Sequence, residues 1–147
     1  MMNKDWPDIA GRIEGAAHVL PVRVYFEDTD FTGVVYYANY LKFAERGRSD
    51  FLRLIDVHHT ELAAENLAFA VRHIEADYLR PARIDDIVLV TTKVAEMRGA
   101  RFMLDQSISR DGETLFTARV TAALLSLQGR PQRIPAGMKA KIDRLIL

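Results

Sequence analysis

The segment with the clearest chemical potential is Asp28-Thr29-Asp30-Phe31-Thr32-Gly33-Val34-Val35-Tyr36-Tyr37, in which acidic residues and a glycine precede a predicted helix. The first turn of a helix has N–H groups without intrahelical partners and carries a partial positive charge of about half a unit. Fixed donors in a favourable potential are what a developing oxyanion requires. A carboxylate with a reference pKa of about 3.9 is ionised near neutral pH and can attack a carbonyl or deprotonate water. The segment therefore indicates acyl transfer, with Asp30 as nucleophile or general base and the Tyr37 N–H polarising the carbonyl.

Two other interpretations compete for the same segment. Asp28 or Asp30 can simply cap the turn, and Gly33 can serve only as a turn residue with positive φ. A calcium loop is the second alternative, because the residues from Asp28 to Gly33 place oxygen ligands and a glycine at EF-hand positions 1, 3, 5 and 6. We reject calcium, since position 12 is Asn39 where a bidentate Glu is expected, and since a strand rather than a helix precedes the segment.

A long helix is expected directly after this turn. Apolar residues recur every three or four positions over residues 37–55, the period of a helix that buries one face. Such a helix would be about 28 Å long. Gly47 lies in its middle at a cost of about 1 kcal/mol relative to Ala. We interpret Gly47 as the position where the helix closely approaches another backbone. The simpler alternative is that the glycine is a tolerated defect.

The rest of the chain is predicted to be mostly extended. A short strand is expected at residues 22–25, after an irregular lead-in over residues 1–21 that is punctuated by glycines and Pro21. Further strands are predicted at residues 68–78, 86–97, 101–109 and 114–127, with Asp111-Gly112 as a hairpin signal. Residues 22–147 are thus expected to form a single α+β domain, in which a curved antiparallel sheet of about five strands wraps the helix. Its free edges predict a homodimer with a continuous sheet.

Composition excludes several classes of function. The chain has 147 residues, which predicts one domain, and 20 Lys+Arg balance 20 Asp+Glu. Because the charges balance, the chain has no net positive charge that would favour binding to nucleic acid or to an anionic membrane surface. Without cysteine there are no disulfides, thiol nucleophiles or Cys-ligated metals. No apolar run approaches the roughly 20 residues that span a bilayer, and the charged first 20 residues do not resemble a secretory signal. We therefore expect a cytoplasmic protein.

The remaining polar residues give weaker indications. The four histidines are scattered and are expected to be solvated loop residues; they are His18, His58, His59 and His73. His58 and His59 are adjacent, but neighbouring side chains on one element point apart and no third ligand clusters nearby, so no metal site is expected. Glu45 and Arg48 lie three residues apart on the helix and are expected to form a local ion pair.

The segment at residues 22–52, VRVYFEDTDFTGVVYYANYLKFAERGRSDFL, resembles the hot-dog acyl-CoA thioesterases of the 4-hydroxybenzoyl-CoA thioesterase superfamily, in particular the bacterial Tol-Pal-associated acyl-CoA thioesterases. The likeness continues through residues 78–86, YLRPARIDD, and 96–99, EMRG. This resemblance implies a hot-dog fold, in which an antiparallel sheet wraps a central helix, and assembly as a homodimer or homotetramer. It also implies hydrolysis of an acyl-CoA thioester without a metal or redox cofactor.

The resemblance also implies roles for individual residues. The family's catalytic aspartate corresponds to Asp30, the second Asp of the DTD motif, and its helix N-terminal backbone donor corresponds to Tyr37. Many Tol-Pal-type members have a histidine at this position, and the tyrosine here keeps the backbone donor but not a histidine side chain. Arg98 matches a loop position that contacts the nucleotide phosphates of CoA. Because Gly99 and Ala100 follow it in place of the further basic residues of some relatives, a looser grip on the nucleotide is expected.

Three further residues are candidates for substrate binding. Gly33 belongs to the turn beside Asp30, and Tyr40 and Phe69 are candidate walls of an acyl pocket, with core packing as the alternative for both aromatic residues. The sequence leaves open the length and type of the acyl group. It also does not decide between a dimer and a tetramer, or between nucleophilic and general-base catalysis.

Two other functions compete with thioester hydrolysis. A hot-dog dehydratase acting on hydroxyacyl carrier protein would need a pocket histidine, and no histidine lies in the strand-to-helix turn. A non-catalytic acyl-binding or scaffolding domain associated with cell-envelope (Tol-Pal) partners is the second alternative, because a fold alone does not prove turnover. An acyl carrier protein or an envelope-system component is a further candidate partner.

Overall fold

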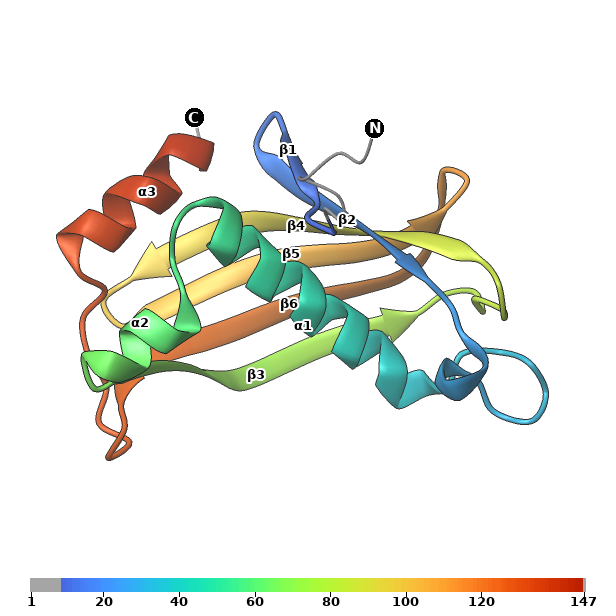
Figure 1. Ribbon diagram of the computed structural model, residues 1–147, viewed down its shortest axis with the longest axis horizontal. Coiled ribbons are helices and arrows are strands. Elements are labelled where there is room, and N and C mark those ends of the chain that lie inside the picture. Colours follow the sequence, from blue (N-terminus) through green and yellow to red (C-terminus); the bar gives the residue numbers. More distant parts are fainter. Residues whose placement is uncertain (1–8, 147) are drawn as a thin grey trace, which may run out of the picture.

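A computed structural model describes residues 9–146, in which one long helix lies across the concave face of a six-stranded antiparallel sheet (Figure 1). The strands are β1 (Arg12–Glu14), β2 (Ala17–Arg23), β3 (Leu67–Tyr78), β4 (Ile87–Arg98), β5 (Arg101–Arg110) and β6 (Glu113–Ser126), in the spatial order β1-β2-β4-β5-β6-β3. The helices are α1 (Tyr37–Leu54), α2 (His59–Ala64) and α3 (Ala136–Ile146), with a 3-10 turn η1 (Phe26–Asp28). The α+β hot-dog prediction is confirmed, with six strands in place of about five.

The predicted irregular lead-in over residues 1–21 is wrong for its second half. Residues 1–8 lie outside the described residues, but β1 and β2 occupy positions 12–14 and 17–23. His18, Leu20 and Val22 alternate inward and are buried, the period of a strand with one covered face. Pro21 is tolerated there because β1 pairs only with residues 17–19, so no β1 carbonyl lies opposite the missing N–H.

Helix α1 packs its buried face against the sheet so closely that a glycine is required. A Cβ atom on Gly47 would lie 2.7 Å from Cγ1 of Val90 and 3.2 Å from Oγ1 of Thr92. Both neighbours are side chains of β4, so the close approach predicted at Gly47 is confirmed, but toward side chains rather than toward a backbone. The buried residues of α1 are Tyr40, Phe43, Ala44, Gly47, Phe51 and Leu52.

A buried polar side chain ties the helix to the sheet at the same place. Gln106 on β5 donates through Nε2 to the Ala44 carbonyl oxygen and to Thr92 Oγ1, both at 2.9 Å. Its Oε1 accepts a hydrogen bond from Arg48 at 2.9 Å. Arg48 therefore reaches across to the sheet, and the expected local ion pair with Glu45 is absent from the described ion pairs.

The prediction that His18 is a solvated loop residue is also wrong. Its ring is fully buried, and Nε2 lies 2.6 Å from Oδ2 of Asp50 on α1. The same carboxylate oxygen accepts the Gly11 N–H at 2.8 Å. These contacts connect the start of the sheet to the helix, and the alternation of His18 with Leu20 and Val22 was the pattern that could have revealed them.

The core has two parts that follow the two halves of α1. Its N-terminal half packs with Phe116 and Ile108, and its C-terminal half packs with Phe102, Leu124 and Ile142. Ile142 comes from α3, which lies beside the end of the sheet where β4 finishes (Figure 1). Over residues 9–146, no helix combines the length and apolar character that crossing a bilayer requires.

Candidate functional site

The turn that carries Asp30 is fastened to the start of α1. The Asp28 carbonyl oxygen accepts the Tyr36 N–H at 3.0 Å and the Asn39 side-chain amide at 2.8 Å. On its other side the turn is bonded to the segment before β4, because the Val35 N–H donates to the Ala82 carbonyl oxygen at 2.9 Å. The turn and the first helical turn are thus held as one unit, as the sequence analysis expects.

Asp30 is partly exposed, and one of its carboxylate oxygens is already used. Its Oδ1 accepts hydrogen bonds from the N–H and the hydroxyl of Thr32, the N–H at 2.8 Å. These hydrogen bonds lower the pKa of Asp30 below its ordinary value of 3.8, and the bond from the Thr32 hydroxyl has the largest effect. Burial opposes them by raising the pKa. The backbone N–H of Val34 also lowers the pKa of Asp30, and Oδ2 accepts neither of the Thr32 hydrogen bonds, so this partly exposed, ionised group can still meet a ligand or water.

Gly33 has a conformational role in this turn. Its φ of 85° lies in the left-handed region, which favours glycine. Its N–H donates to the Asp30 carbonyl oxygen at 3.1 Å, and its own carbonyl oxygen accepts the Ile84 N–H at 3.2 Å. The Gly33 amide is therefore occupied by the turn.

The first turn of α1 has two free backbone donors. The N–H groups of Tyr36 and Asn39 donate to the Asp28 and Tyr36 carbonyl oxygens, at 3.0 and 2.8 Å. No acceptor among residues 9–146 contacts the N–H of Tyr37 or that of Ala38. The sequence analysis selected only Tyr37. Ala38 could have been found from the rule that the first N–H groups of a helix lack intrahelical partners.

Tyr78, at the end of β3, supports the same helical turn and was missed by the sequence analysis. Its hydroxyl donates to the Tyr37 carbonyl oxygen at 3.0 Å, and its ring contacts the Tyr37 ring edge-on with centroids 6.0 Å apart. Burial raises the pKa of the Tyr78 phenol. Tyr36, Tyr37 and Tyr78 are exposed and in ring contact in sequence, with Tyr36 against Tyr37 and Tyr37 against Tyr78, so they form an aromatic surface beside the helix start.

Tyr40 packs in the core of the described chain. It is only 4% exposed, and its ring stacks on Phe116 with centroids 5.3 Å apart. Its hydroxyl accepts the Ala82 N–H at 2.9 Å, which anchors the segment before β4 to the helix. The alternative of core packing, noted for Tyr40 from its sequence, is the one that the structure supports.

Phe69 lines a cavity, but one far from Asp30 in the same chain. The cavity has a volume of about 290 Å³ and lies between the C-terminal half of α1 and strands β3, β5 and β6. It is lined by Glu45, Arg48, Ser49, Leu52, His59, Phe69, Ala70, Val71, Phe102, Leu104 and Ala122. Since Arg48 follows Tyr37 by eleven residues on α1, the cavity is about 16 Å along the helix axis from the free N–H groups.

Arg98 also lies far from Asp30 within one chain. It is the exposed last residue of β4, paired with Arg101 across the β4–β5 turn. The opposite end of β4 begins at Ile87, which pairs with Arg23 close to the Asp30 turn. At about 3.3 Å per residue, the length of β4 puts Arg98 roughly 35 Å from that end.

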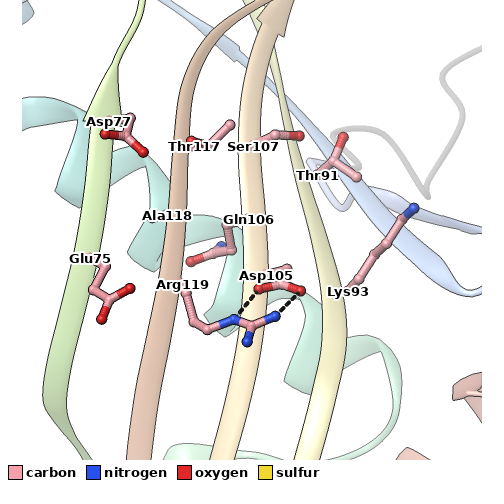
Figure 2. Close-up of a pocket in the computed structure, with 10 residues that line it drawn as sticks. All are labelled: Glu75, Asp77, Thr91, Lys93, Asp105, Gln106, Ser107, Thr117, Ala118 and Arg119. Carbon is pink, nitrogen blue, oxygen red and sulfur yellow. Dashed lines mark hydrogen bonds and ion pairs between the residues drawn. The ribbon is translucent and has the colours of Figure 1, made fainter.

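A second hollow lies on the outer face of the sheet, the face opposite α1, and all but one of the residues that line it have polar side chains (Figure 2). Its centre is the pair Asp105 and Arg119, joined by two hydrogen bonds of 2.7 and 2.9 Å. Ala118 is the only apolar residue in its lining, so the hollow lacks the walls that an acyl group needs.

Histidine and carboxylate side chains do not converge on a metal position within the described part of the chain. His58 and His59 have different partners. Nε2 of His58 lies 2.9 Å from Oδ1 of Asp56, whereas Nε2 of His59 lies 3.4 Å from Oγ of Ser49.

Comparisons with known proteins identify the family. A model of the thioesterase-like superfamily matches residues 24–142. Acyl-CoA thioesterase YbgC of Haemophilus influenzae is 40% identical over 127 residues, 85% of this chain and 93% of that protein. Acyl-CoA thioester hydrolase YbgC of Escherichia coli O6:H1 is 39% identical over 126 residues, 84% of this chain and 94% of that protein. A probable thioesterase from Bartonella henselae superposes with a TM-score of 0.79 at 45% identity, over 81% of this chain and 99% of that chain. The chain therefore belongs to the thioesterase-like superfamily, as its sequence resemblance predicts.

Proposed function

We propose that the protein hydrolyses acyl-CoA thioesters to the free acid and CoA, with Asp30 and the Tyr37 N–H as its catalytic groups. The observation that carries the proposal is an ionised, partly exposed carboxylate in a turn that is hydrogen-bonded to the start of α1, where two backbone N–H groups have no partner among the described residues. Relatives about 40% identical are named acyl-CoA thioesterases, which supports the same reaction.

The reaction needs one carboxylate and one oxyanion donor. In the nucleophilic form, an Asp30 oxygen bonds to the thioester carbon and the carbonyl oxygen becomes an oxyanion, stabilised by the N–H groups of Tyr37 and Ala38. The C–S bond then breaks, CoA leaves as a thiolate that takes a proton, and water hydrolyses the mixed anhydride. In the general-base form, Asp30 takes a proton from the water that attacks the same carbon. Both forms use the same two groups.

A second copy of the chain would bring Phe69 of one subunit toward Tyr37 of the other. Strand β3 is twelve residues long and lies at the edge of the sheet, and its Val71 is 46% exposed. A long free edge favours pairing with another strand. Two-fold antiparallel pairing would bring the start of the partner subunit's β3, which carries Phe69, toward the Tyr78 end and hence toward Tyr37.

The expected assembly is therefore at least a homodimer. Light scattering on the purified chain should give at least twice the 16.7 kDa chain mass at micromolar concentration. A monomeric mass would contradict completion of the site by a second copy, while leaving the chemistry of Asp30 open to the hydrolysis assay.

The direct test of the activity is release of CoA, followed with a thiol reagent, from a panel of short, long and aromatic acyl-CoAs. Because the chain has no cysteine, every reactive thiol in the assay comes from the product. We expect release well above the uncatalysed rate for at least one member. Binding without release would favour the acyl-binding or scaffolding alternative with envelope-system partners. An acyl carrier protein thioester belongs in the panel because it presents the same carbonyl.

A further inference from the structure

Tyr78, the last residue of β3, places its hydroxyl on one particular peptide group of α1. The hydroxyl donates to the Tyr37 carbonyl oxygen at 3.0 Å. That carbonyl and the Ala38 N–H are the two ends of one peptide group, because the amide bond between residues 37 and 38 joins them. The Ala38 N–H is one of the two backbone donors at the helix start that have no acceptor among residues 9–146. Tyr78 therefore occupies the acceptor end of a peptide group whose donor end is free.

A hydrogen bond at the carbonyl end of a peptide group changes the N–H at its other end. The bond draws electron density toward the oxygen, and resonance across the planar group makes the nitrogen more positive. In a regular α-helix the same oxygen faces the N–H of residue 41, so the Tyr78 hydroxyl is an additional donor to it. Hydrogen bonds that share a group in this way strengthen one another by about 10–30% per bond. The Ala38 N–H is therefore a stronger donor than it would be without Tyr78.

Three aromatic contacts fix the position of the Tyr78 hydroxyl. Its ring meets those of Phe116, Tyr40 and Tyr37 edge-on, with centroids 5.1, 5.5 and 6.0 Å apart. Phe116 and Tyr40 are buried in the core, so they hold the ring from a rigid side. Burial is the main cause that raises the pKa of the Tyr78 phenol above its ordinary value of 10.0, and the hydroxyl therefore keeps its proton at neutral pH.

We propose that Tyr78 is a positioning residue of the thioesterase site, whose hydroxyl polarises the peptide group between Tyr37 and Ala38 and so strengthens the Ala38 N–H as an oxyanion donor. It acts through this peptide group and not through contact with the reacting atoms. Its role in turnover rests on the proposed function, because the oxyanion is that of thioester hydrolysis. The polarisation itself exists in the free protein and is measurable without turnover.

The first experiment examines the peptide group in the absence of substrate. Tyr78→Phe removes the hydroxyl and keeps the ring, so the contacts with the core should remain. In the ¹³C,¹⁵N-labelled full chain, loss of the hydrogen bond should move the carbonyl ¹³C resonance of Tyr37 and the amide ¹⁵N resonance of Ala38 to lower frequency. Unchanged resonances at both positions would show that the hydroxyl does not polarise the group, and would overturn the proposal.

The second experiment separates kcat from KM. Removing one oxyanion donor costs about 10²–10³ in kcat, and 10–30% of that free energy corresponds to roughly a two- to eightfold loss. Tyr78→Phe should lower kcat by this factor and leave KM within about twofold, since the oxyanion forms during the reaction and not in the bound thioester. A loss confined to KM would assign Tyr78 to substrate binding and would overturn the proposal.

Tyr25→Phe is the matched control, because it removes a hydroxyl from another exposed tyrosine, on the connection between β2 and α1. The backbone of Tyr25 exchanges hydrogen bonds with Asp28, and these do not depend on the phenol. We expect kcat and the resonances of Tyr37 and Ala38 to stay unchanged in this variant. Equal changes in the two variants would contradict a specific role for Tyr78.

Should Tyr78→Phe not fold, replacement of Tyr78 by 3-fluorotyrosine supplies the second variant. Fluorine withdraws electrons from the ring and makes the hydroxyl a stronger donor, so both resonances should move to higher frequency and kcat near neutral pH should not fall. Movement to lower frequency would overturn the proposal. Absence of CoA release from the unmodified chain would contradict the proposed function, whereas release that is equally fast in Tyr78→Phe would contradict only the role of Tyr78.

Discussion

Replacing Asp30 by asparagine is expected to lower kcat for acyl-CoA hydrolysis at least about 100-fold, the usual contribution of a positioned acid or base. Asparagine is neutral at neutral pH and is neither a nucleophile nor a base of comparable strength. Its amide oxygen can still accept the hydrogen bonds from Thr32 that Oδ1 accepts now, so the turn should keep its shape. The loss should therefore appear in kcat, with an unchanged circular dichroism spectrum.

The matched control is Glu27→Gln, which removes a carboxylate from the same connection between β2 and α1. Glu27 is exposed in the 3-10 turn and takes no part in the proposed chemistry. We expect its activity to stay within a few-fold of the unmodified chain. Wild-type turnover in Asp30→Asn, or equal losses in both variants, would contradict the assignment of Asp30.

The pH profile provides an independent measure of the same carboxylate. Hydrogen bonds from Thr32 lower the pKa of Asp30 below 3.8, so its reactive ionised form persists as the pH falls to that value. Any acid limb that Asp30 causes should therefore have its midpoint below pH 3.8. A decrease in activity with a midpoint near pH 6 would indicate that a group other than Asp30 is the catalytic one.

Replacing Phe116 by alanine should destabilise the chain by about 3–5 kcal/mol, the range measured for aromatic residues removed from cores. Phe116 is fully buried, and its ring centroid lies 5.3 Å from that of Tyr40 and 5.1 Å from that of Tyr78. The substitution loses apolar burial and leaves a cavity between the sheet and the first turns of α1. Urea unfolding at fixed protein concentration measures the change, since an assembled protein would also gain stability with concentration.

Phe26→Ala is the matched control for that measurement. Phe26 is 78% exposed in the 3-10 turn, so its removal should change the free energy of unfolding by less than about 0.5 kcal/mol. If Phe116→Ala were as mild as Phe26→Ala, the ring packing that supports Tyr40 and Tyr78 would carry little energy, and the described core would need revision.

Local periodicity made much of the fold predictable. Helix α1 begins at Tyr37 as expected and ends one residue before the predicted end. Strands β3 to β6 follow from β-branched runs and from the Asp111-Gly112 turn. The strand predicted at residues 22–25 overlaps only the last two residues of β2, because Pro21 was interpreted as a break. Pro21 is tolerated within β2 because the neighbouring β1 is short. That information lies in the pairing of strands and not in the local sequence.

In the candidate site, too, contacts between residues close in sequence were predictable and contacts between distant residues were not. Asp30 and Tyr37 are seven residues apart, so turn and helix rules are enough to place them together. Tyr78 reaches Tyr37 across 41 residues, and Arg48 reaches Gln106 across 58. Such contacts depend on how α1 lies on the sheet, which a one-dimensional pattern does not fix. Tyr40 illustrates the ambiguity, since an aromatic residue at helical spacing fits a core and a pocket equally well.

The two free donors at the start of α1 belong to the main chain. Any residue except proline supplies an N–H, so the side chain at position 37 can be exchanged without deleting the donor. The ring of Tyr37 is 60% exposed and lies beside that donor. Under the proposed function, position 37 is therefore a natural place to redesign selectivity by mutagenesis, because libraries built there would change the surroundings of the proposed oxyanion donor while keeping that donor.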